Sequence, residues 1–132
     1  MPHLGPFLAS APFDATDPSG VLRGARRIVV LRLDNAGDVI LAGPALRALR
    51  AVLPGSELVM VTSRQGSAAA ELLPWVDEIV LWRALWQDTS GALAFDPARE
   101  FEAIDRLRAL RADAALILTS FSQTPFAAAY AC

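Results

Sequence analysis

The stretch RIVVLRLDNAGDV, residues 27–39, joins an apolar run to a short polar turn. The run Ile28–Leu33 is rich in β-branched residues and flanked by arginines, as is typical of a strand buried on both faces of a parallel sheet. The turn Asp34–Asp38 contains Gly37, which we expect to supply an unusual backbone angle. An apolar helix is expected to follow directly, from Val39 to Leu53. This order of strand, polar turn and helix is the repeating unit of an α/β fold.

The same unit recurs along the chain. Further strands are expected over residues 58–62, 77–82 and 114–118, and further helices over residues 67–73, 97–111 and from 126 onward. In the first helix the residues expected to face the sheet are Leu41, Ala45, Ala48, Leu49 and Val52. In the helix from Pro97, which Asp96 is expected to cap, they are Phe101, Ile104, Leu107 and Leu110.

Alternation of strands and helices predicts a Rossmann-like, doubly wound parallel sheet. With the common strand order 3-2-1-4, the sheet reverses direction between its first and fourth strands. Ligands of such sheets bind outside the carboxyl ends of the strands at this reversal. We therefore expect the loops 34–38 and 120–125 to border one crevice.

Composition narrows the function classes. The 132-residue chain has 12 basic and 14 acidic side chains, a net charge of -2, and no lysine. This balance disfavours nucleic-acid binding by bulk charge, and the absence of lysine excludes a Gly-x-x-x-x-Gly-Lys phosphate loop. One cysteine, Cys132, and one histidine, His3, do not suffice for a cysteine-rich metal cluster or for Ser-His-Asp catalysis.

The chain divides into two regions. Residues 1–25 are rich in proline and glycine and are expected to form a flexible leader, whereas one Rossmann-like domain is expected over residues 26–132. The sequence contains neither an apolar run long enough to span a membrane nor a signal peptide, so we expect a cytoplasmic protein. The last helix reaches Cys132 without a C-cap, which predicts a domain that is incomplete at its C-terminus.

Two carboxylates lie in the turn after the first expected strand. Asp38 precedes the apolar helix, so it can act as the N-cap of that helix or as a general base at the mouth of the crevice. Asp34 is more simply explained as a turn-forming residue. The second loop offers polar groups that can hydrogen-bond a polyol: Ser120, Ser122, Gln123 and Thr124. Thr124-Pro125 can equally cap the last helix.

Other ligand-binding patterns are weaker. The turn after the first strand lacks the Gly-x-Gly-x-x-Gly pattern of dinucleotide-binding proteins. A magnesium-binding receiver domain would require a lysine on a later loop. The tryptophans Trp75, Trp82 and Trp86 can act as sugar-stacking platforms, although packing beneath loops is the simpler explanation for most of them.

Residues 27–39, followed by Gly43–Leu49, resemble the opening of glycosyltransferase family 9, the ADP-heptose:lipopolysaccharide heptosyltransferase family. Residues 73–78 and 113–118 also fit this family. The resemblance covers about residues 26–132, and its most specific part is the Gly37-Asp38-Val39 turn with the Pro-Ala-Leu that follows.

The resemblance implies a GT-B fold of two Rossmann-like domains, of which this chain corresponds to the N-terminal, acceptor-side one. It implies an inverting transfer without metal, in which Asp38 is the base and the second domain, missing from this chain, holds the nucleotide-activated donor, such as ADP-heptose. We expect substrate contacts from Asn35, Gly37, Ser120 and Gln123. The implied acceptor is a glycan or glycolipid of the lipopolysaccharide-core type, reached by peripheral contact with the inner face of the inner membrane.

Two alternatives remain at this point. One is a non-catalytic domain that binds a sugar or a partner protein, and the other is an unrelated module such as a receiver domain. The intact Asp38 in its turn favours the enzyme over the first alternative, and the absence of lysine disfavours the second. We also expect the isolated chain to be inactive and to self-associate through an unpaired sheet edge.

Overall fold

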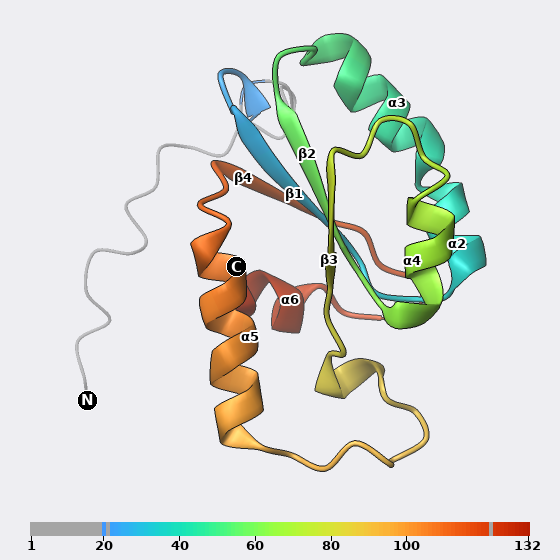
Figure 1. Ribbon diagram of the computed structural model, residues 1–132, viewed down its shortest axis with the longest axis vertical. Helices are drawn as coiled ribbons and strands as arrows, with labels where there is room; N and C mark the ends of the chain where they lie inside the picture. Colours follow the sequence, from blue (N-terminus) through green and yellow to red (C-terminus); the bar gives the residue numbers. More distant parts are fainter. Residues whose placement is uncertain (1–19, 21, 122) are drawn as a thin grey trace.

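The computed structural model describes residues 20, 22–121 and 123–132. Most of the expected leader, with His3, and Ser122 of the polar cluster therefore lie outside the described residues. Within them, one sheet contains the parallel strands β1 (Arg27–Arg32), β2 (Glu57–Thr62), β3 (Glu78–Leu81) and β4 (Ala114–Ile117). The strand order is β3-β2-β1-β4, which confirms the predicted α/β fold and the predicted order (Figure 1).

Helices cover both faces of the sheet (Figure 1). One face carries α2 (Ala36–Leu41), α3 (Gly43–Val52) and α4 (Arg64–Ala70). The other carries α5 (Pro97–Ala109) and α6 (Phe126–Ala131), and a short 3-10 helix, η1 (Leu85–Gln87), follows β3. Alternate residues of β1 enter the two cores, Val30 on the α2 side and Leu31 on the α5 side. This burial on both faces explains the nearly continuous apolar run of the strand.

The helix expected over residues 39–53 is two helices. Helix α2 begins three residues earlier than expected, and the chain starts again at Gly43-Pro44 because proline is readily accommodated in a first helical turn. The predicted apolar stripe is only partly correct: Leu49 packs against the core as expected, but Leu41 and Val52 are exposed. Leu46, which lies outside the predicted stripe, is fully buried. The true stripe is offset from the predicted one by about 100° around the helix, which is one residue.

Three further expectations are corrected. The helix after β2 begins at Arg64 rather than residue 67, because Ser63 caps it by accepting a hydrogen bond from the Gly66 N–H. Phe101 lies on the solvent side of α5 and is 67% exposed, although Leu107 of the same helix is buried as predicted. Gly37 lies inside α2 and has no positive φ. The predicted cap Asp96 accepts a hydrogen bond from the Ala98 N–H, as expected.

Candidate functional site

The carboxyl ends of β1 and β4 lie side by side, and the loops that follow them meet. The Ser120 hydroxyl is 3.2 Å from Nη2 of Arg32, and Nε2 of Gln123 is 2.7 Å from Oδ1 of Asp34. These bonds join positions almost 90 residues apart in the chain. The prediction that the two loops adjoin at the reversal of the sheet is confirmed.

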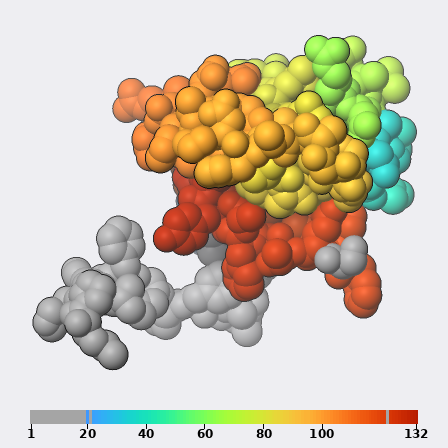
Figure 2. All heavy atoms as spheres, turned by 90° about the horizontal axis from the view of Figure 1, so that it is seen from below, coloured from blue at the N-terminus to red at the C-terminus, as the bar shows by residue number. Residues whose placement is uncertain are grey.

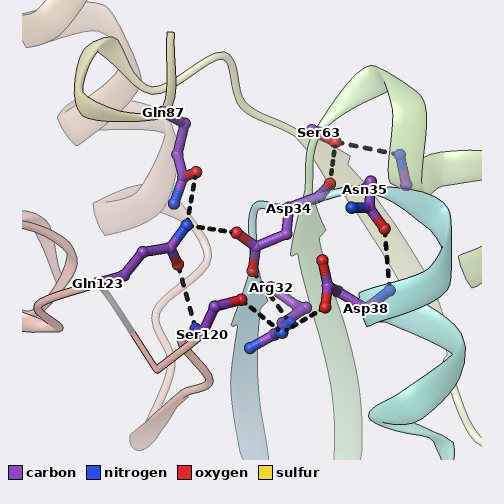
Figure 3. Close-up of polar contacts among 9 residues, drawn as sticks. Arg32, Asp34, Asn35, Asp38, Ser63, Gln87, Ser120 and Gln123 are labelled. Carbon is purple, nitrogen blue, oxygen red and sulfur yellow. Dashed lines mark hydrogen bonds and ion pairs between the residues drawn. The ribbon is translucent and has the colours of Figure 1, made fainter. Parts of the chain in front are cut away.

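Arg32, the last residue of β1, is the centre of this cluster (Figure 3). Its side chain is only 10% exposed, and it lies between two carboxylates. Its Nε is 3.1 Å from Oδ2 of Asp34, and its Nη2 is 3.0 Å from Oδ1 of Asp38. A guanidinium so far removed from water requires such partners, because an unpaired buried charge costs several kcal/mol.

Asp34 is held from three directions. Its side chain is 8% exposed and contacts Arg32 through one oxygen and Gln123 through the other. Its backbone carbonyl accepts a hydrogen bond of 2.6 Å from the Ser63 hydroxyl at the end of β2. The interpretation of Asp34 as a simple turn residue is therefore incomplete, because its carboxylate is a buried partner of a buried cation.

Asp38 is the more accessible carboxylate, with a side chain that is 25% exposed. It is not the N-cap: Asn35 caps α2 by accepting a hydrogen bond from the Asp38 N–H, and Asp38 lies in the first helical turn. Its Oδ1 contacts Arg32, and its Oδ2 has no hydrogen-bond or ion-pair partner among the described residues. A carboxylate with one held and one free oxygen can accept a proton from a bound hydroxyl group.

A pocket of about 760 Å³ opens on the same edge of the sheet, toward α5 rather than between β1 and β4. Its lining follows β1, β2 and β3 and includes Leu33, Arg64, Trp82, Gln87, Arg99 and Arg106. Figure 2 views this edge, where α5 and the segment before it cover much of the surface beside the C-terminal segment. A second cavity, of only about 10 Å³, is lined by residues of β1, η1, β4 and α6. Where the chain segments after β1 and β4 meet, their side chains contact each other directly.

The expected substrate-binding residues do not line the larger pocket. The Asn35 side chain caps α2. A Cβ added at Gly37 would lie 3.2 Å from the Oδ1 atom of Asn35. Ser120 and Gln123 belong to the polar cluster around Arg32 and Asp34. Gln123 also donates a hydrogen bond of 3.2 Å to the Gln87 side chain, which does line the pocket. The cluster and the pocket are thus neighbours.

The tryptophans separate into different roles. Trp82 is mostly buried yet lines the pocket, and Trp86 meets it edge-on with ring centroids 5.0 Å apart. Trp75 packs against the core on the opposite face of the sheet. The packing explanation therefore holds for Trp75, whereas Trp82 both packs and forms part of a surface that can contact a ligand.

Sequence reasoning missed Arg32 and Gln87 as site residues. Arg32 is the last residue of the buried strand β1, where a charged side chain demands a partner. That demand was a usable signal, but the partner residues could not be identified without the strand order. Gln87 lies in the connection after β3, where no local pattern marks it.

No three potential metal ligands come together within the part of the chain that the structure describes. None of the helices in that part is long and apolar enough to cross a membrane.

No protein-family model matches the sequence, and no curated protein matches it. The fold is similar to the crystal structure of a glycosyl transferase family 9 protein from Veillonella parvula, with 27% sequence identity and a TM-score of 0.51. The similarity covers 64% of this chain and 23% of that protein, so the match spans about a quarter of its length. Fold and sequence motif thus agree, and the resemblance of this chain to glycosyltransferase family 9 is confirmed.

Proposed function

We propose that the chain is the acceptor-side domain of an inverting glycosyltransferase, with Asp38 as its general base. The sugar transferred is a heptose or a related sugar from a nucleotide-activated donor, and the acceptor is a glycan of the lipopolysaccharide-core type. One observation carries the proposal: Asp38 presents a free carboxylate oxygen at the carboxyl edge of a sheet similar to that of a family 9 protein.

The chemistry requires little from this domain beyond a base and a place for the acceptor. Oδ2 of Asp38 takes the proton of an acceptor hydroxyl group while the hydroxyl oxygen forms a bond to the anomeric carbon of the donor. The bond from that carbon to the diphosphate breaks, and the nucleoside diphosphate leaves with the electron pair. We assign the binding of that diphosphate to a second Rossmann-like domain, and the transfer step itself uses no metal.

The 760 Å³ pocket is the proposed acceptor site. It offers the Trp82 ring for contact with the apolar face of a sugar, and Gln87 for its hydroxyl groups. Arginines and carboxylates both line it, so it suits a polar and charged ligand better than an apolar one. Gln87 is joined through Gln123 to Asp34, which connects the pocket to the cluster that holds the base.

Acceptor binding can be tested without a donor domain. A deacylated core oligosaccharide of lipopolysaccharide is titrated into the chain, and the indole N–H signals are followed by NMR. We expect the Trp82 signal to move while that of Trp75, on the other face of the sheet, stays in place. ADP alone should move neither signal.

A Gln87→Ala variant should weaken the oligosaccharide-dependent shift, because it removes a polar group of the pocket. Thr119→Ala, two residues after β4 and not part of the lining of this pocket, is the matched control. An unmoved Trp82 signal at saturating oligosaccharide, or an equal response to ADP, would contradict the assignment of this pocket to the acceptor.

A further inference from the structure

The cluster at the end of β1 contains two carboxylates and one guanidinium. Arg32 contacts Asp34 through Nε and Asp38 through Nη2, so its single positive charge is shared. With both carboxylates ionised, the three side chains carry a net charge of -1. A simple ion pair of Arg32 with Asp38 would instead be neutral and would hold the carboxylate in its charged form.

The two carboxylates are not equivalent. Asp34 is 8% exposed and has contacts on both oxygens, while Asp38 is 25% exposed and has contacts on one. The contact of Arg32 Nε with Asp34 Oδ2 also lacks hydrogen-bond geometry, so it acts mainly through charge. Asp34 is therefore placed to offset the charge of Arg32, and Asp38 is placed to exchange a proton.

We propose that Arg32 and Asp34 are positioning residues for Asp38: the guanidinium fixes its carboxylate, and Asp34 offsets the charge of the guanidinium. The proposal rests on the proposed function only in naming Asp38 as the base. When Asp38 takes a proton from the acceptor, the cluster becomes neutral, which favours the transfer in a poorly hydrated site.

Other charged groups around Asp38 do not share this geometry. Helix α4, which packs against α2, carries one charged residue, Arg64, and it is exposed. Helix α3 carries Arg47, which is exposed, and Arg50, which binds Asp77 at the opposite edge of the sheet. From the loop after β4 come the neutral groups Ser120 and Gln123. Arg32 and Asp34 therefore dominate the charge that faces Asp38.

The test compares Asp34→Asn with Ser120→Ala in the 132-residue chain. The side-chain carboxyl carbon of Asp38 is followed by NMR as the pH is lowered. Removing the Asp34 charge leaves Arg32 to act on Asp38 alone, so the midpoint of the Asp38 signal should move to lower pH. Ser120→Ala removes a neutral partner of Arg32 and should leave the midpoint in place.

Arg32→Gln provides the opposite change, because it leaves two like charges facing each other. The midpoint of the Asp38 signal should then move to higher pH. If Arg32→Gln does not fold, the result for Asp34→Asn decides the test. An Asp34→Asn midpoint equal to that of the parent overturns the proposal. In a transfer assay with the donor domain present, Asp34→Asn should lower kcat about tenfold with little change in KM.

The NMR midpoints test the positioning roles of Arg32 and Asp34, whereas the transfer assay tests the proposed glycosyl transfer. If the parent transfers no sugar but the NMR midpoints move as expected, glycosyl transfer is wrong and the positioning roles stand. If the parent is active and the midpoints do not move, the positioning roles are wrong and the transferase remains.

Discussion

At the amino-terminal edge of the sheet, Asp77 and Asp113 accept hydrogen bonds from the backbone of the neighbouring strand, whereas at the carboxyl edge Asp34 and Asp38 share one guanidinium. Asp77 accepts from the Leu58 N–H at 2.8 Å, immediately before β3 begins. Asp113 accepts from the Arg26 and Arg27 N–H groups at 2.8 and 2.9 Å, immediately before β4 begins. The same residue type thus ties strands together at one edge and, in Asp38, leaves one carboxylate oxygen without a partner among the described residues at the other.

Under the proposed function, the two edges separate stability from chemistry. Carboxylates that accept backbone N–H groups are fixed in their ionised form and brace the start of each outer strand. At the carboxyl edge, α4 begins beside the turn that carries Asp34, so the packing of that helix supports the site. Substitutions at the two edges should therefore have different consequences.

The largest effect on stability is expected from Gly66→Ala at the carboxyl edge. A Cβ there would press against the Thr62 hydroxyl and lie 2.7 Å from Cγ2 of Val39, and both residues are fully buried. Such overpacking should lower the free energy of unfolding by about 1–3 kcal/mol in urea titrations. Gly55→Ala at the amino edge, where a Cβ meets nothing within 4 Å, is the control and should be nearly neutral. Equal free energies of unfolding for Gly66→Ala and Gly55→Ala would contradict the close approach of α4 to Thr62 and Val39.

A smaller effect is expected from Asp77→Ala at the amino edge. This change removes the acceptor of the Leu58 N–H and the partner of Arg50, whose Nη2 is 2.6 Å away. Because the side chain is 45% exposed, solvent weakens these bonds, and the loss should be about 1 kcal/mol. Asp105→Ala, at a surface position 71% exposed, should change the free energy of unfolding very little. If Asp77→Ala lowered the free energy of unfolding as little as Asp105→Ala does, the hydrogen bond from β2 to Asp77 would be unimportant for stability.

The smallest expected effect is on the free energy of unfolding at acid pH. The Arg27 and Arg26 N–H groups lower the pKa of Asp113 below its ordinary value of 3.8. Burial acts to raise the pKa of Asp77, but the Leu58 N–H and Arg50 outweigh it and lower that pKa as well. A carboxylate whose pKa is lower in the folded state adds stability above the unfolded pKa and loses it as the pH falls through the folded value.

The chain should therefore lose stability as the pH falls below about 4, the ordinary range for an aspartate. Asp113→Asn should make this decline shallower, because its side chain no longer titrates. Urea midpoints at pH 3 and pH 6 measure the decline, with Asp105→Asn as the control. An unchanged decline in Asp113→Asn would mean that the bonds to the β1 backbone do not favour its ionised form.

Much of the fold follows from local pattern. The strands were predicted because β-branched apolar runs such as Ile28–Leu31 are bounded by polar turns, and the strand order is the common one of doubly wound sheets. The beginnings of the helices were predicted less well. Asn35 and Asp38 are both good N-cap residues, and the sequence alone does not decide which of them caps α2.

The site was predicted only in part. The turn that carries Asp38 was identified, but its partners come from distant parts of the chain: Ser63 follows β2 and Gln123 follows β4. Gln87, which follows β3, joins the cluster only through Gln123. Their convergence depends on the strand order and on the loop conformations. The position of the pocket was likewise not predictable, because its lining brings together residues that follow β2 and β3 with residues of α5.

The central claim is that Asp38 serves chemistry while the aspartates of the amino edge serve stability. The most direct test is the transfer rate of Asp38→Asn in an assay with the donor-side domain present. An asparagine can still accept a hydrogen bond from Arg32, which keeps its contact with Asp34, so the fold should be retained. We predict that kcat falls about a hundredfold or more with little change in donor binding. Near-normal turnover in Asp38→Asn would contradict the account.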